Sequence, residues 1–428
     1  MRPPGGPRTA LTRRGRRLLG CGAALLLAGA LLGERPVVQL AVFVLALPLV
    51  SAAVVSRDRF RPSVARTVTP PRVRRGEPAS VLLEVTSAGR RAGATWLLEE
   101  QLPEALGPAP RFAVTGLSAG RRTALRYPLL PTRRGRFLLG PLRSRVVDPF
   151  GLVERSAPGT GQAPLLVLPR VQPLGAGAPR DGHGGEGARR SIAVHGEDDV
   201  SVREYRRGDD LRKVHWRATA RTGDLQVRTE ERPWRSRTTV LLDTRRSAHL
   251  VAPLHDPDPA DSLEWAVEAA ASIAAALVRG GAQVQVLTGD GELGGTGTTT
   301  AQLLDRLALV TPSPRRDLAP GLAALRRVAG EGEVVCLLGA LEPDDVAELV
   351  AARPGAGAGL AVLLDLGTFV PALRGNRSGT SPGGTALDEQ RADAAARLRA
   401  AGWRVAVVGS GSPVAAAWAA RQPAGAPR

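Results

Sequence analysis

The chain has 428 residues, of which 43% are hydrophobic, so it is long enough for two or three domains that each bury a core. Its 58 Lys and Arg against 40 Asp and Glu give a formal net charge of +18, but Lys213 is the only lysine and the arginines are spread along the chain. This distribution predicts a solvated basic surface and argues against a nucleic-acid interface. The two cysteines, Cys21 and Cys336, exclude a disulfide framework and a cysteine-based zinc site.

The N-terminal region predicts a pair of membrane-spanning helices. Residues 1–17 are basic and contain no acid, and two uncharged apolar runs follow at 18–33 and 37–55. As helices these runs would be roughly 24 and 28 Å long, near the thickness of a bilayer core. We therefore expect two transmembrane helices within residues 18–56, with the lipid bilayer as a partner.

Arginines flank this hairpin at both outer ends and are scarce in its link. The positive-inside rule then places both ends in the cytoplasm. The sequence predicts a two-pass plasma-membrane protein with the bulk of the chain cytoplasmic. A cleaved signal peptide and a buried core hairpin are the alternatives, and the second apolar run argues against the first of them.

Residues 62–175 predict a small antiparallel β-sandwich-like domain. Short alternating or β-branched runs are separated by Gly and Pro, as in strands joined by turns. The polar, Gly-rich residues 176–198 predict a flexible linker or loop. The expected strands are 79–87, 95–100, 111–115, 122–130, 135–139, 142–147 and 164–168.

Residues 199–236 contain many opposite charges among aromatic residues. Asp209 or Asp210 could cap a short helix at 211–220, in which Val214 and Ala218 would share one face. One hypothesis makes catalytic carboxylates of the acids in this segment, with His215 as proton carrier. The other is an Arg–carboxylate network or partner contact, which we favour because neighbouring cations keep carboxylates ionised. The acids concerned are Asp209, Asp210, Glu230 and Glu231.

The string YRRGDDLRKVHWRATAR at 205–221 resembles the signature of the bacterial family called domain of unknown function 58. That family usually has Asp where His215 stands and Ser where Thr219 stands. The stretches RGRF at 134–137, GPL at 140–142 and DPFGL at 148–152 resemble the same family. The candidate signature or interaction residues are Tyr205, Gly208, Asp209, Asp210, Arg212, His215, Trp216, Arg217, Arg221 and Asp243.

Residues 237–420 predict an α/β domain of Rossmann type. Apolar strands alternate with helices, a pattern typical of a parallel sheet covered on both faces, and ligands of such sheets bind at the carboxyl ends of the strands. The expected strands are 238–243, 282–287, 333–338, 360–366 and 403–408, and the expected helices are 261–279, 301–309, 318–328, 344–352, 386–401 and 413–420. The fold class is therefore multidomain: a membrane hairpin, a β-sandwich-like domain and this α/β domain.

Asp243 ends the first of these strands, in a region that resembles von Willebrand A-type domains. The resemblance implies a metal motif, Asp-x-Ser-x-Ser, whose oxygens hold a divalent cation. Here the motif is degenerate: Asp243 and Ser247 remain, but Arg245 stands at the middle Ser. A guanidinium there would repel a cation, or would take its place and pair with Asp243. We expect no metal, no cofactor and no catalytic residue.

The family resemblance implies a membrane-bound partner of MoxR-type AAA+ ATPases, often beside a transglutaminase-like membrane protein. We therefore expect an interaction or adaptor protein and not an enzyme. The Gly-rich residues 289–295 predict a loop, since no phosphate-binding motif opens a helix there. Two alternatives stay open: a divalent-metal-dependent enzyme or metal-dependent adhesion-type domain centred on Asp243, and nucleic-acid binding through arginine.

Overall fold

The chain divides into two compact units. One unit holds Met1–Val171, Ala252–Pro259 and Ala301–Thr311, and the other holds the remainder. The computed structural model describes residues 8–57, 62–87, 95–115, 122–148, 150–175, 201–205, 214–229, 237–251, 261–295, 297–328, 332–352, 359–370 and 382–421. The predicted linker at 176–198 and half of the signature lie outside the described residues.

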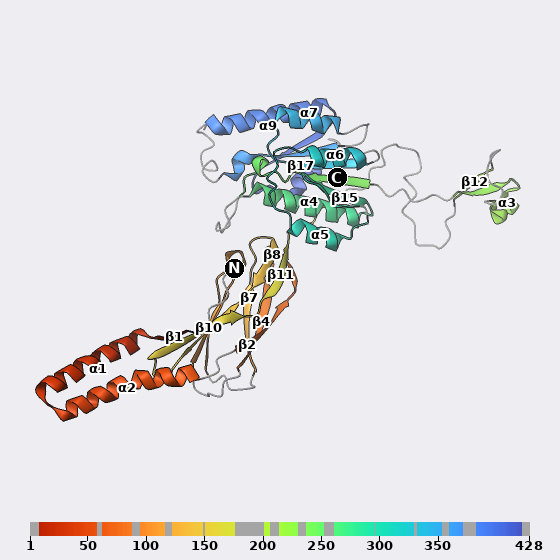
Figure 1. Ribbon diagram of the computed structural model, residues 1–428. Helices are drawn as coiled ribbons and strands as arrows, with labels where there is room; N and C mark the ends of the chain where they lie inside the picture. The colour runs from red at the N-terminus through yellow and green to blue at the C-terminus, as the bar shows by residue number, and fades with distance from the viewer. Residues whose placement is uncertain are drawn as a thin grey trace. The chain divides into compact units, whose positions relative to one another are not determined.

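The first unit begins with a helical hairpin, α1 (Arg13–Leu32) and α2 (Arg35–Arg57), whose helices lie side by side (Figure 1). Both are long and apolar enough to cross a bilayer. Helix α1 starts five residues before the apolar run because Thr12 caps it, accepting from Gly15 N at 3.1 Å. Gly22 lets the helices approach closely, since a Cβ there would lie 2.8 Å from Leu45.

The rest of this unit is built of β-strands in three sheets. The first has the order β1-β10-β9-β5-β6, the second β2-β4-β7 and the third β3-β11-β8. Strands β1, β2, β3 and β10 were not predicted. Strand β10 pairs with β9 on either side of a bulge that contains Pro158 and Gly159. The bounds are β1 Arg8–Leu11, β2 Pro62–Thr69, β3 Arg72–Arg74, β4 Ala79–Ser87, β5 Thr95–Glu100, β6 Arg111–Thr115, β7 Arg122–Leu129, β8 Gly135–Leu139, β9 Leu142–Val147, β10 Val153–Thr160 and β11 Ala163–Leu168.

Side chains from all three sheets share one apolar core, in which Leu83, Leu98, Leu139 and Leu165 are almost fully buried. This core also encloses an ion pair: the Arg66 Nε lies 2.7 Å from Glu100 Oε1. Gly140 leaves room for that guanidinium, because a Cβ at this position would lie 2.8 Å from Arg66 Nη2.

The second unit contains a six-stranded sheet in the order β16-β15-β14-β17-β18-β19. All neighbours are parallel except β16, which runs antiparallel to β15. The prediction of a loop at 289–295 is wrong in part, since β16 lies within it and pairs with β15. The bounds are β14 Arg237–Leu242, β15 Gln283–Thr288, β16 Gly291–Gly294, β17 Glu333–Leu338, β18 Gly359–Leu364 and β19 Arg404–Val408.

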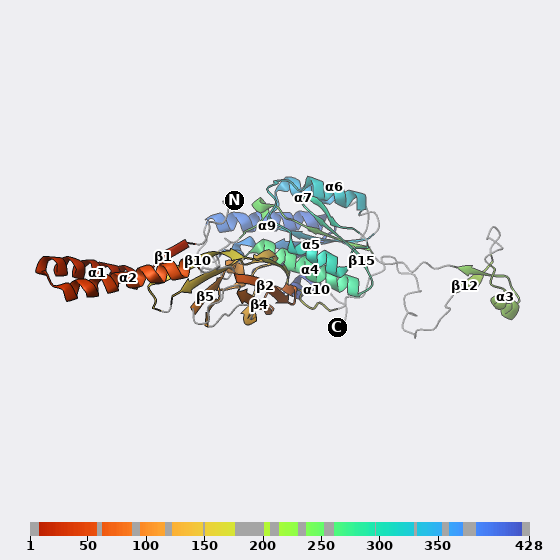
Figure 2. The same cartoon turned by 60° about the horizontal axis from the view of Figure 1, so that its bottom comes forward.

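Helices cover both faces of this sheet, with α4 and α10 on one face and α6, α7 and α9 on the other (Figures 1 and 2). Helix α4 begins one residue later than expected, because Asp261 is its N-cap and accepts from Leu263 N and Glu264 N. Most of α5 (Thr300–Ala308) clusters with the first unit. The remaining bounds are α4 Ser262–Arg279, α6 Ala319–Val328, α7 Pro343–Ala351, α9 Pro382–Ala400 and α10 Val414–Ala419.

The signature segment forms a small element of its own: β12 (Ser201–Glu204) pairs antiparallel with β13 (Gln226–Thr229), and α3 (Trp216–Thr222) lies between them in sequence. The predicted helix at 211–220 is wrong in its start. Val214 forms a bridge with Val227 and is therefore not helical. His215 caps α3 with Nδ1, which accepts from Ala218 N at 3.1 Å.

Candidate functional site at the carboxyl edge of the parallel sheet

Asp243 lies at the carboxyl edge of the sheet, directly after β14. The sheet order reverses at β14, which has β15 on one side and β17 on the other, and such a switch point is where open α/β sheets bind ligands. Asp243 N donates to Leu337 O at 2.9 Å, and its side chain is fully buried. A buried carboxylate at this position requires a partner.

That partner is Arg245. Its Nη2 lies 2.9 Å from Asp243 Oδ2 and its Nε lies 3.1 Å from Asp243 Oδ1, so the pair is bidentate. The Arg245 backbone N also donates to Asp243 Oδ1, at 3.0 Å. The pairing that the sequence offered as one of two outcomes is present.

The same guanidinium bonds three more groups around the edge. Its Nη1 donates to both carboxylate oxygens of Asp345 and to Arg316 O, at 2.9 to 3.1 Å, and its Nη2 donates to Ala340 O at 3.2 Å. Arg245 is only 3% exposed. Burial by itself would lower the pKa of Arg245, but the Asp243 and Asp345 carboxylates raise it above its ordinary value, so the cation is permanent.

These residues do not fit a divalent cation. Such an ion needs several oxygens that are free to coordinate it, whereas both oxygens of Asp243 and both of Asp345 already bond the guanidinium. An ion could enter only by displacing Arg245. Ser247, the other remnant of the motif, is exposed on a short 3-10 turn. No group of three or more potential metal-ligating side chains occurs in the described part of the chain.

Asp345 and His249 belong to this site and were missed from the sequence. Asp345 lies in the first turn of α7 and also accepts from Glu342 N at 2.9 Å. His249 is buried, with Nε2 2.9 Å from Asp243 O and Nδ1 3.1 Å from Ser262 Oγ. Because a carbonyl only accepts, Nε2 carries the proton and Nδ1 accepts. Burial lowers the pKa of His249, so the ring stays neutral.

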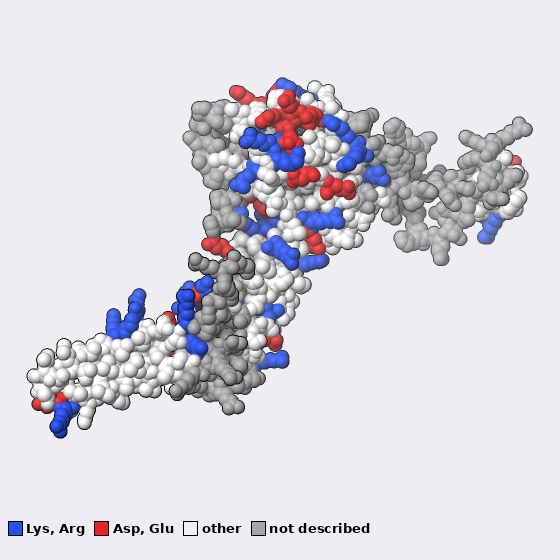
Figure 3. Space-filling model, viewed as in Figure 1, with Lys and Arg blue, Asp and Glu red and all other residues white. Residues whose placement is uncertain are grey.

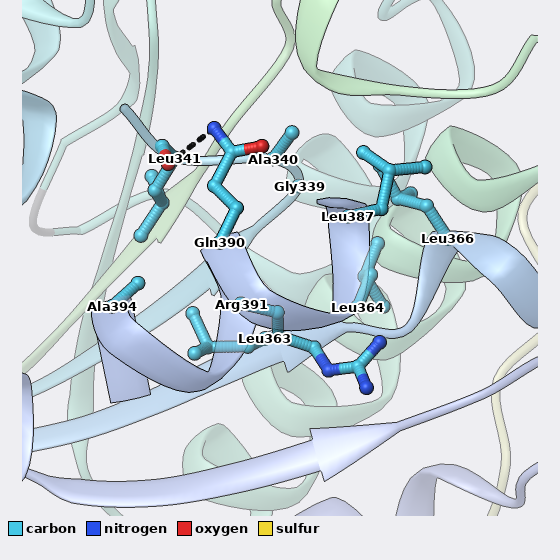
Figure 4. Close-up of a pocket in the computed structure, with 10 residues that line it drawn as sticks. All are labelled: Gly339, Ala340, Leu341, Leu363, Leu364, Leu366, Leu387, Gln390, Arg391 and Ala394. Carbon is cyan, nitrogen blue, oxygen red and sulfur yellow. Dashed lines mark hydrogen bonds between the residues drawn. The ribbon is translucent and has the colours of Figure 1, made fainter. Parts of the chain in front are cut away.

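A hollow adjoins the ion pair at the same edge. It is small and shallow, opens to solvent, and is lined by the ends of β17 and β18 and by α9 (Figure 4). Its lining combines the apolar side chains of Leu341, Leu364 and Leu387 with the polar Gln390 and the charged Arg391. Gln390 closes one side through Nε2, which donates to Leu341 O at 2.8 Å. Ala340 contributes to the hollow and accepts from Arg245, so the two features share one wall.

Acidic side chains gather on the face that carries α7 and α9 (Figure 3). Glu342, Asp344 and Glu348 are exposed at α7. A chain of net charge +18 therefore presents a negative surface beside the hollow. Charge of this sign favours a partner with a basic surface.

The described signature residues lie apart from the Asp243 pair in sequence and form no carboxylate cluster. Tyr205 N donates to Leu225 O at 2.8 Å, while Trp216 is 71% exposed and Arg217 and Arg221 are exposed on α3. Gly208, Asp209, Asp210, Arg212, Glu230 and Glu231 lie outside the described residues.

Residues 201–365 match the model of a family described as "Protein of unknown function DUF58". This region of the chain belongs to the DUF58 family. The matched region contains the signature segment and all of Asp243, Arg245, His249 and Asp345. A search of the curated proteins finds no match to this DUF58 chain.

Three solved structures that resemble parts of this chain have very low TM-scores. The CARDB domain of a Pyrococcus furiosus protein, in complex with di-metal ions, is 14% identical with a TM-score of 0.18 and covers 25% of this chain and 94% of that one. The alkylpurine DNA glycosylase AlkC of Pseudomonas fluorescens, bound to DNA, is 16% identical with a TM-score of 0.18 and covers 36% and 45%. A β-glucosidase from Erythrobacter marinus is 15% identical with a TM-score of 0.17 and covers 26% and 16%. The chain thus spans under half of the last two proteins, and scores this low carry no argument.

The three motifs at 134–137, 140–142 and 148–152 lie outside the matched region, and each contains a residue that makes a structural contact. Arg134 Nε donates to Leu307 O at 3.1 Å and its Nη2 donates to Val310 O at 2.6 Å. These bonds join the end of α5 to the segment before β8, within the first unit. Gly140 accommodates Arg66, as described above. Asp148 organises a turn beside α1, through Oδ1, which accepts from Val153 N at 2.6 Å.

Proposed function

We propose that this DUF58 protein is a membrane-anchored adaptor that works with a MoxR-type AAA+ ATPase in the assembly or maturation of partner proteins. The observation that carries the proposal is the Arg245 guanidinium held by Asp243 and Asp345. At the edge where a related fold would present a metal ion, the chain presents its own buried cation. The edge is therefore suited to contact a protein and not to metal chemistry.

The surroundings of Arg245 support a protein contact. The leucine side chains that line the shallow hollow offer a partner a small apolar contact, because apolar side chains gain free energy when they leave water. The exposed acids of α7 supply charge beside it. An apolar centre with a charged rim is the usual anatomy of a protein–protein interface.

The two apolar helices support the anchor. Their lengths suit a bilayer core, and the arginines around the hairpin favour a cytoplasmic location for both ends. An adaptor held in this way keeps a soluble ATPase at the membrane, where a transglutaminase-like membrane protein could be among the clients.

The test is site-specific photocrosslinking in reconstituted membranes that contain the full chain and the purified MoxR-type ATPase of the same genome. A benzophenone amino acid replaces Leu387, which lines the hollow. The control replaces Arg327, which is exposed at the C-terminal end of α6 and so lies at the amino edge of the sheet. We expect an ATPase adduct from position 387 and little from position 327. Equal yields, or none at either position with ATP present, would refute the contact.

A further inference from the structure

Phe150 is an exposed aromatic side chain, 65% accessible, at the edge of the β unit. The turn that carries it is held firmly by Asp148, which is 5% exposed. Asp148 Oδ1 accepts from Val153 N at 2.6 Å, Oδ2 accepts from Phe150 N at 3.2 Å, and the Asp148 carbonyl accepts from Gly151 N at 2.9 Å. A polar anchor of this kind fixes the turn while leaving the ring in solvent.

This turn is bonded to the start of α1. Thr12 N donates to Leu152 O at 2.9 Å and Thr12 Oγ1 donates to Gly151 O at 2.6 Å. The contact is so close that a Cβ at Gly15 would lie 2.1 Å from Leu152 O. Leu152 and Val153 also pack with Leu11, Leu18, Leu47, Ala52 and Val55. The turn and the hairpin base therefore form one packed structure.

Helix α2 is hydrogen-bonded to strand β10, which follows the same turn. Arg155 Nη1 donates to Val55 O and to Ser56 O, both at 2.8 Å. These carbonyls lie in the last turn of α2, which ends at Arg57. Both helices of the hairpin are thus bonded to the strand and turn that follow Asp148.

The length of α1 sets the level of the turn. Helix α1 has 20 residues from Arg13 to Leu32. At 1.5 Å per residue it is about 30 Å long, and its apolar part from Leu18 to Leu32 accounts for about 22 Å, against about 30 Å for the hydrocarbon core of a typical bilayer. If the tip of the hairpin reaches one membrane surface, the turn bonded to Thr12 lies at the other.

Arginines surround the start of α1 at this level. All four in its first two turns are exposed, and Figure 3 shows blue side chains on the hairpin near its attachment to the β-strands. Arginine near a bilayer surface is attracted to anionic headgroups, and its aliphatic stem tolerates the boundary region. The residues are Arg13, Arg14, Arg16 and Arg17.

We propose that the turn carrying Phe150 is an interfacial membrane anchor. Phe150 enters the boundary between headgroups and acyl chains, and the arginines at the start of α1 contact anionic headgroups. An aromatic ring with adjacent cations is the composition that favours this layer. The inference rests on the proposed membrane location of the hairpin, and it adds that the β unit itself sits at a set depth on the lipid surface.

The experiment measures the depth of an environment-sensitive fluorophore on single cysteines of the full chain in lipid vesicles. Cys21 is replaced by Ala, and Cys336 is buried and stays. One variant carries Phe150→Cys. The control carries Leu130→Cys, a 57% exposed apolar position that follows the end of β7 remote from the hairpin. A third variant, Leu27→Cys, labels the middle of α1, where the side chain is 64% exposed.

We expect shallow spin-labelled lipid to quench the label at 150 at least about twofold more than the label at 130, because only the former lies in the interface. Replacing zwitterionic with anionic vesicles should raise the quenching at 150 further. Equal quenching at 150 and 130, with strong quenching at 27, would refute the interfacial anchor and leave the membrane hairpin intact. No quenching at 27 would refute the hairpin and with it both proposals. No response at 150 to anionic lipid would refute the role of the arginines.

Discussion

Asp345 accepts two hydrogen bonds from Nη1 of Arg245, at 3.0 and 2.9 Å, although the two residues are 100 positions apart in sequence. Arg245 is bound to Asp243 at the same time. One guanidinium therefore joins the end of β14 to the first turn of α7. This guanidinium is therefore a structural link across the carboxyl edge of the sheet.

Replacing Arg245 with Leu should destabilise the α/β unit by about 3–5 kcal/mol, because it leaves the fully buried Asp243 carboxylate uncompensated. Cys336 is buried in β17 of this unit and reports its opening. The measurement is the rate of Cys336 modification in urea, in a Cys21→Ala background. Arg246→Leu is the control, since Arg246 is exposed and should change the rate little.

Adding Asp243→Asn to Arg245→Leu should recover part of the loss, since no buried charge is then left unpaired. Unfolding of the double variant at the same urea concentration as the single variant would mean that Asp243 does not depend on Arg245 for its charge balance.

Replacing Arg245 with Ser should create affinity for Mg²⁺ or Mn²⁺. The substitution frees the oxygens of Asp243 and Asp345 and adds a hydroxyl, a set of ligands that suits a hard cation. We expect either ion to slow Cys336 modification in this variant, by binding the folded state, and to leave the native chain unchanged. Arg245→Leu serves as the control because it frees the same carboxylates without a hydroxyl. An equal effect of the ion on the native chain would contradict the conclusion that Arg245 blocks the site.

Acidification should destabilise the α/β unit through His249. Burial lowers its pKa in the folded state, so below the unfolded value of about 6.5 the unfolded chain binds a proton that the folded chain does not. The contribution of this histidine is thus fully present above that pH and is lost as the pH falls below it. The thermal midpoint should fall between about pH 6.5 and 5, and His249→Gln should reduce the slope. A slope unchanged in the variant would assign the effect to other groups.

Replacing Arg66 with Met should destabilise the β unit by about 3–5 kcal/mol, because Glu100 is fully buried and has its bidentate partner in Arg66. The neighbouring pair offers a matched control. Arg111 lies 2.8 Å from Glu99 with 80% of its side chain exposed, so Arg111→Met should cost about 1 kcal/mol or less. Hydrogen exchange of β5 measures both. Similar exchange in the two variants would show that burial does not set the strength of the first pair.

Local patterns sufficed for most elements. The strands β17 and β18 and the helix α4 lie where the sequence placed them, within a few residues. Residue propensity gave the wrong secondary structure where pairing with a distant strand determines it. Strand β10 contains Ser, Pro and Gly, and Val214 bridges Val227 where a helix was expected. Ser156 and Val214 adopt extended backbone because each pairs with a neighbouring strand, whereas Pro158 and Gly159 lie in a bulge of β10.

The same division holds for the candidate site. The presence of Arg245 two positions after Asp243 was readable from five consecutive residues, but its pairing with Asp243 was only one of the two outcomes expected there. Asp345 and His249 were not, since neither lies in a pattern that differs from an ordinary helix start or loop. Their contacts with the Asp243 loop exist only once β14 and α7 share one edge of the sheet.

By itself the sequence determined the two apolar helices, the alternation of strands and helices after residue 237, the family signature and the cation at the degenerate motif. All of these are encoded in spacings of a few residues, which local periodicity and side-chain chemistry report. Only the tertiary structure decided which acids share Arg245 and where the Phe150 turn lies relative to α1. Those relations join segments about a hundred or more residues apart, and they arise from the packing of whole sheets and helices, which no short pattern contains.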